Sequence, residues 1–169
     1  MDGGVHFIAA IRMMLGSEND ITRVSAFTIQ LQEHLPPVDT VNAIMKTKTG
    51  ISGTFSVSFG TTARGSGYTI ACEHGTVTVL RSQVVVQKDG HEETKSFPDE
   101  GSGVKQEVRA WSEGLATGIQ DSRQSPDEAL KDLVVVCADS LSAFGANTFK
   151  LESALKSGEN DGAPVSLSR

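Results

Sequence analysis

The feature that most constrains the fold is a run of strand-like segments joined by very short links. From about residue 21 to residue 97 the sequence is rich in β-branched residues, and it alternates most clearly over 51–59, where Phe55, Val57 and Phe59 are interleaved with serine and threonine. Further strands are expected at 21–32, 38–49, 68–73, 76–81, 83–88 and 92–97. Links at 74–75 and at Asp89-Gly90 are only two residues long, which permits antiparallel neighbours alone.

Segments with apolar residues at helical spacing lie before and after these predicted strands. Apolar residues recur at helical spacing over 4–15, ending at Gly16, and again from Val104 to Ile119. The second stripe, which includes Trp111, is expected to lie on the sheet as core. A third helix should start at Ser125, with Ser125 as N-cap, Pro126 in the first turn and Glu128 closing a capping box.

This order of elements predicts an α+β domain: an open, mostly antiparallel β-sheet with helices packed on one face. We expect this domain to span residues 1–157, followed by a polar C-terminal tail over 158–169. The strand count alone also allows a closed antiparallel barrel with appended helices. An open sheet leaves a face of small hydroxyl side chains, which is either solvated or buried in a symmetric homodimer.

Composition excludes several classes of function. A net charge of -6 and the lack of a basic stripe argue against nucleic acid or an anionic membrane as partner. Cys72 and Cys137 lack metal-ligand spacing and lie in apolar stretches, so both are expected to be reduced core residues, although a disulfide between them stays open. Without a convincing signal peptide or a spanning segment, the expected location is cytoplasmic.

Asp2 and His6 are the strongest candidates for chemistry. They are four residues apart at the start of the first helix, so their side chains would stack on one face. A carboxylate beside an imidazole favours the protonated ring and fixes which nitrogen carries the proton, as a general acid or base requires. The alternative is that Asp2 is a favourable helix N-terminal charge and His6 an ordinary histidine.

The other possible sites are weaker. The loop 60–66 has the glycine spacing of a phosphate loop but carries Ser66 where a lysine is required, and no G-x-G-x-x-G follows a strand. His91-Glu92-Glu93 fits a solvated strand end better than a metal site, and His34 and His74 are expected at the surface.

The opening residues, with Asp2, Gly4 and His6 leading into an apolar helix, resemble the motif that opens the C-terminal domain of the Gfo/Idh/MocA oxidoreductases, the family of glucose-fructose oxidoreductase and inositol dehydrogenase. The run 125–133 and the segments 154–158 and 162–165 are similar to that family's closing helix and Ser-Gly tail, whereas 139–153 looks like extra sequence with a helix break at 143–147. In the family, the Asp and His of the motif stand beside the nicotinamide.

This resemblance implies an NAD- or NADP-dependent oxidoreductase acting on the CH-OH group of a sugar, cyclitol or similar polyol. His6 would exchange the substrate's hydroxyl proton together with a lysine from a first, dinucleotide-binding domain, and Asp2 would orient His6. It also implies a homodimer through the open sheet face. Because the chain begins inside the motif, we expect a late-assigned start codon or a split gene, and no cofactor binding or dehydrogenase activity for this chain alone. The alternative is a stand-alone, non-catalytic dimerising or small-molecule-binding module.

Overall fold

The computed structural model describes residues 3–142 and 149–150, with side chains described over 3–136. The described chain divides into two compact units, one formed by residues up to Thr61 together with those from Ser122 onward, and the other by Thr62–Asp121. The predicted boundary at residue 157 lies outside the described residues, as does the predicted helix break at 143–147, and both stay predictions.

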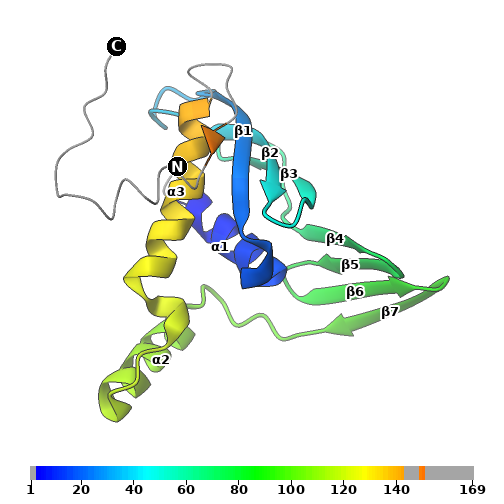
Figure 1. Cartoon of the computed structure of the whole chain (residues 1–169), viewed down its shortest axis with the longest axis vertical. Helices are drawn as coiled ribbons and strands as arrows, with labels where there is room; N and C mark the ends of the chain where they lie inside the picture. Colours follow the sequence, from blue (N-terminus) through cyan, green and yellow to red (C-terminus); the bar gives the residue numbers. More distant parts are fainter. Residues whose placement is uncertain (1–2, 143–148, 151–169) are drawn as a thin grey trace. The chain divides into compact units, whose positions relative to one another are not determined.

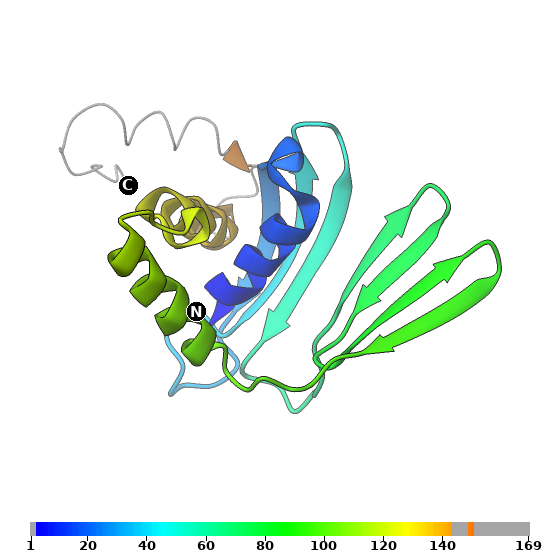
Figure 2. The same ribbon diagram turned by 90° about the horizontal axis from the view of Figure 1, so that it is seen from below.

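The first unit contains a four-stranded antiparallel sheet of order β3-β2-β1-β8 (Figure 1). Its strands are β1 (Ile21–Ile29), β2 (Thr40–Thr47), β3 (Ser52–Ser58) and the short β8 (Phe149–Lys150), which pairs with Arg23 and Val24 of β1. The helices α1 (Gly4–Leu15) and α3 (Pro126–Ser142) both lie on one face of this sheet (Figure 2). The predicted α+β architecture with helices on one face of an open sheet is therefore confirmed.

The core of the first unit lies between that face and the two helices. Alternation along each strand sends every second side chain inward, as the predicted period of two requires. Ile8 of α1 and Val41 of β2 are fully buried, and Val24 of β1 is nearly so. The remaining buried apolar residues are Ile21, Ala26, Ala43, Met45, Phe55, Val135 and Val136.

The second unit is a separate antiparallel meander of order β4-β5-β6-β7, followed by α2 (Val104–Thr117). The strands are β4 (Tyr68–Cys72), β5 (Gly75–Val79), β6 (Gln83–Lys88) and β7 (His91–Ser96). Asp89 and Gly90 form the predicted tight turn, with φ of 50° and 79°. The turn between β4 and β5 consists of residues 73–74, one position earlier than predicted, because Gly75 already pairs with Cys72.

Two predictions about the second unit are wrong. The apolar stripe of α2 is exposed rather than packed on a sheet, with Trp111 60% and Leu115 66% exposed. Cys72 is an exposed free thiol rather than a core residue, because it ends the short edge strand β4. The side chain of Cys137 lies outside the part of the chain whose side chains are described.

Two short 3-10 turns frame the helices of the first unit. One, Ser17–Asn19, joins α1 to β1, and the other, Ser122–Gln124, precedes α3. The Oγ of Ser125 accepts a hydrogen bond from the backbone N–H of Glu128 at 3.2 Å, so the predicted N-cap of α3 is confirmed. The carboxylate of Glu128 does not close a capping box, because Arg12 and Lys131 bind it.

Candidate functional site

His6 lies on the face of α1 that points away from the sheet. Ile8 at the centre of the opposite face is fully buried, whereas His6 is exposed, as is Met13 two turns later on the same side. Among residues 3–136, His6 makes no hydrogen bond or ion pair. The imidazole therefore has both ring nitrogens available to a ligand or to groups outside the described chain.

Asp2, the other member of the predicted pair, lies outside the described residues. Its proposed role in orienting His6 stays a prediction. What the structure adds is the local setting of the motif: Gly4 is buried at the start of α1, which places the beginning of the helix directly against the core.

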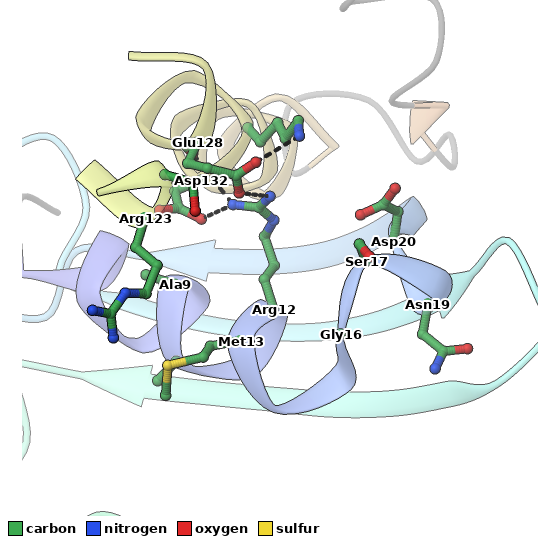
Figure 3. A pocket seen from close by; sticks show the side chains of 13 residues that line it. Ala9, Arg12, Met13, Gly16, Ser17, Asn19, Asp20, Arg123, Glu128 and Asp132 are labelled. Carbon is green, nitrogen blue, oxygen red and sulfur yellow. Dashed lines mark hydrogen bonds and ion pairs between the residues drawn. The ribbon is translucent and has the colours of Figure 1, made fainter. Parts of the chain in front are cut away.

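A pocket of about 490 Å³ opens further along α1, between the helix, the turn that follows it and the start of α3. Ala9, Ala10 and Met13 contribute apolar groups to its α1 wall, and Figure 3 shows Ala9 and Met13 there. Arg12 is the polar lining residue from α1, and the others come from the segments that follow α1 and from the start of α3: Ser17, Asn19, Asp20, Ser122, Arg123, Glu128, Lys131 and Asp132.

Arg12 joins α1 to α3 at the edge of this pocket (Figure 3). Its guanidinium donates to Oε2 of Glu128 at 2.7 Å, to the backbone carbonyl of Glu128 at 3.2 Å, and to the carboxylate of Asp132. Glu128 and Asp132 are four residues apart and so share one face of α3. Lys131 adds a second cation to Glu128 at 2.7 Å.

The charges of this cluster stabilise one another. Burial alone would lower the pKa of Arg12, but hydrogen bonds to Asp132 and Glu128 outweigh burial and raise it. Hydrogen bonds from Lys131 and from Arg12 lower the pKa of Glu128. Because its ionised groups are matched within the protein, the cluster is suited to fixing the two helices rather than to proton transfer.

A second charged group that sequence reasoning missed is Asp39, which is 1% exposed. Its carboxylate accepts hydrogen bonds from the backbone N–H groups of Leu31 and Gln32, at 3.0 and 2.8 Å, and from the hydroxyl of Thr40 at 2.8 Å. Burial acts to raise the pKa of Asp39, but these hydrogen bonds together lower it. With its donors supplied by the chain, this carboxylate holds the loop before β2 in place.

Neither cluster carried a recognisable sequence signal. Arg12 interrupts an apolar helix, and Glu128 with Asp132 forms an i,i+4 acidic pair on another helix, but only the fold brings the three together. Asp39 follows the Pro36-Pro37 pair at the start of a strand, which indicates a turn rather than an anchor.

The weaker candidates do not form sites in the described chain. His34, His74 and His91 are exposed, as predicted. The loop after Gly60 leads into strand β4 and not into a helix, and Gly60 itself lies against the Asp39 carboxylate, which is unfavourable for a phosphate group. Within the described residues there is no cluster of three or more metal-ligating side chains.

Residues 1–78 of the chain match the protein-family model that describes the GFO/IDH/MocA C-terminal domain. A dehydrogenase of Fusarium mangiferae, FPY6, is 34% identical over 143 residues, which are 80% of this chain and 41% of that protein. The structure is also similar to an oxidoreductase from Thermotoga maritima, with a TM-score of 0.78 and 27% identity over 90% of this chain and 44% of the other.

A third similar protein is an oxidoreductase from Agrobacterium radiobacter whose structure contains NAD+, L-tartaric acid and magnesium. It has a TM-score of 0.76 and 19% identity, covering 89% of this chain and 48% of the other, and it supports the fold alone. The chain thus spans less than half the length of each of these three proteins. Taken with the motif at residues 2–6, these matches show that the chain is similar to the C-terminal domain of the Gfo/Idh/MocA oxidoreductases in both sequence and fold.

Proposed function

We propose that this chain is the substrate-side and dimerisation domain of an NAD- or NADP-dependent oxidoreductase that acts on the CH-OH group of a sugar, cyclitol or similar polyol in the cytoplasm. The observation that carries the proposal is the position of His6, which is exposed on the outer face of α1 without a partner among residues 3–136. A functional histidine in such a setting forms half of a site whose other wall is supplied by a further part of the protein.

The role of His6 follows from the chemistry of its side chain. A neutral imidazole accepts the proton of a substrate hydroxyl as the alcohol becomes a carbonyl, and returns it in the reverse direction. In the proposal, Asp2 orients the ring and stabilises its protonated form. NAD or NADP, when bound, supplies the hydride acceptor.

The described residues do not fit dinucleotide binding by this domain alone. Across residues 3–142 and 149–150, no glycine-rich turn connects a strand to a helix in the way that a pyrophosphate site requires. In this proposal, the cofactor binds to a region of a longer enzyme outside these 169 residues. The chain by itself should therefore not turn over NAD(P)H.

The experiment is to read the transcript upstream of Met1 and to assay the protein encoded by the longest reading frame with NAD+ or NADP+ and a panel of polyols. Turnover that is lost in His6→Asn while the unfolding midpoint is unchanged supports the proposal. Turnover that is insensitive to His6→Asn contradicts it. The 169-residue chain serves as the negative control, and activity in that chain alone would also contradict the proposal.

The proposed dimer uses the face of the first sheet that the helices leave uncovered (Figure 2). Phe27 and Ile29 of β1 and Ile44 of β2 are 83%, 53% and 63% exposed there. Exposed apolar groups of this size on one face favour a self-complementary contact. We expect a dimer in sedimentation, converted to a monomer by Phe27→Asp, whereas Phe97→Asp in the second unit should leave it intact; a monomeric wild-type chain contradicts this part of the proposal.

The alternative is a stand-alone, non-catalytic dimerising or small-molecule-binding module. The two functions differ in what His6 does. For a binding module, His6→Asn changes ligand affinity or stability, and a transcript that begins at Met1 yields a protein without turnover.

A further inference from the structure

The ring of Phe59 lies against the opening turn of α1, where residue 3 is a glycine. A Cβ atom placed on Gly3 would be 3.0 Å from Cζ and 3.2 Å from Cε1 of Phe59. The Cβ atom of any other residue at position 3 would therefore crowd the Phe59 ring. Despite this contact, the Phe59 side chain remains 46% exposed, so one part of the ring touches the helix and another faces solvent.

The backbone of Phe59 is held firmly although its ring is half-exposed. Its N–H donates to the carbonyl of Asp39 at 2.9 Å, just beyond the end of β3. The next residue, Gly60, lies so close to the carboxylate of Asp39 that a Cβ would be 2.5 Å from Oδ2. The buried, fully hydrogen-bonded Asp39 therefore fixes the backbone from which the ring projects.

Phe59 is also close to His6 along the helix. Gly3 and His6 are three residues apart and lie on neighbouring positions of the α1 surface. The ring that rests on Gly3 is thus within about one helical turn of the imidazole, and both side chains are accessible to solvent. An apolar aromatic surface and a proton-accepting group are therefore both found at the N-terminal end of α1.

We propose that Phe59 is the aromatic platform of the substrate site, on which the C–H face of a sugar or cyclitol ring lies while one of its hydroxyl groups points to His6. This inference rests on the proposed function. Cyclic polyols carry hydrogen-bonding groups around their rim and apolar C–H groups on their faces, so they need a flat apolar surface beside polar groups. Phe59 supplies the first and His6 the second.

The test is an NMR titration of the isotopically labelled 169-residue chain with myo-inositol, following the signals of Phe59, Gly3 and His6. All three should shift together and saturate. Phe59→Leu should weaken the apparent Kd by about 3- to 10-fold, and Phe59→Tyr should retain it. Phe97→Leu is the matched control, since Phe97 is 45% exposed, and it should change nothing.

Gly3→Ala tests the same contact from the helix side, because the added methyl group lies 3.0 Å from Cζ of Phe59 and pushes the ring slightly outward. It should weaken binding while the core amide spectrum is unchanged. It also stands in for Phe59→Leu if that variant does not fold. An apparent Kd that Phe59→Leu and Gly3→Ala leave unaltered overturns the platform, as does the absence of saturable shifts. Neither result decides the proposed function, which depends on turnover by the longer protein and its loss in His6→Asn.

Discussion

Replacing Arg12 by methionine should destabilise the first unit by about 2–3 kcal/mol. The side chains of Arg12 and Asp132 are 13% and 14% exposed, and that of Glu128 is 37% exposed. Methionine keeps the apolar stem but leaves two carboxylates on one face of α3 without their shared cation. Losing one partner of a fully buried pair costs about 3–5 kcal/mol, whereas an exposed pair contributes about 0–1, and this partly buried cluster lies between those limits.

Urea unfolding at pH 7 measures the effect as a lower free energy of unfolding at an unchanged m-value. The matched control is Arg109→Met, which removes a salt bridge to Glu113 whose side chains are 79% and 63% exposed. We expect no measurable change for that variant. In the double variant Arg12→Met with Glu128→Gln, the two losses should not add, because the same contact is removed twice.

The penalty of Arg12→Met should also depend on pH. Because hydrogen bonds from Lys131 and Arg12 lower the pKa of Glu128 in the folded state, its contribution is present above the pKa of an unfolded glutamate and is lost as pH falls through the lowered value. The difference between wild type and Arg12→Met should therefore be largest near neutrality and narrow in acid, below about pH 4. A penalty below about 0.5 kcal/mol at pH 7 would refute the reasoning, since it would place the cluster with ordinary surface pairs.

Three further predictions concern the first unit. Gly60→Ala should lower the urea midpoint more than Gly53→Ala, because a methyl group on Gly60 displaces the Asp39 carboxylate whereas one on Gly53 meets no atom within 4 Å. Asp39→Asn should destabilise the chain at pH 7 and approach wild type in acid, because the pKa of Asp39 is lowered in the folded state and its contribution is lost as pH falls through that value; unfolding curves between pH 7 and pH 3 decide this. His6→Asn should leave the thermal midpoint of the 169-residue chain unchanged, and a clear decrease would indicate a structural role for the imidazole.

The features that were predictable from the sequence are those with local causes. The N-cap of α3 depends on Ser125 and the three residues after it, and the turn between β6 and β7 depends on Asp89 and Gly90. The alternation around Phe55 likewise reports which side of β3 meets the core. In each instance the residues that determine the structure lie within one turn or one strand of each other.

Features with distant causes were missed or wrong. Arg12 meets Asp132 across 120 positions of sequence, and the carboxylate of Asp39 is satisfied by a loop eight residues away. The stripe of α2 has the period of a core helix, yet Trp111 is 60% exposed in the structure. The helical spacing of apolar residues shows that one face of a helix is apolar. What covers that face depends on the tertiary structure, which the spacing does not reveal.

The helix α1, which carries His6 of the predicted active-site motif, is held in place at three points. Near its end the helix is bound to α3 through Arg12, in its middle Ile8 is fully buried, and at its start Gly3 lies under the Phe59 ring. All three contacts belong to the first unit. The backbone that carries His6 is therefore held in place by packing within the first unit. If the proposed enzyme assembles around this face, the backbone of its proposed proton acceptor is already held in place, and the orientation of the imidazole ring depends on Asp2 or on the substrate; a fixed backbone is one part of the preorganisation that acid–base catalysis requires.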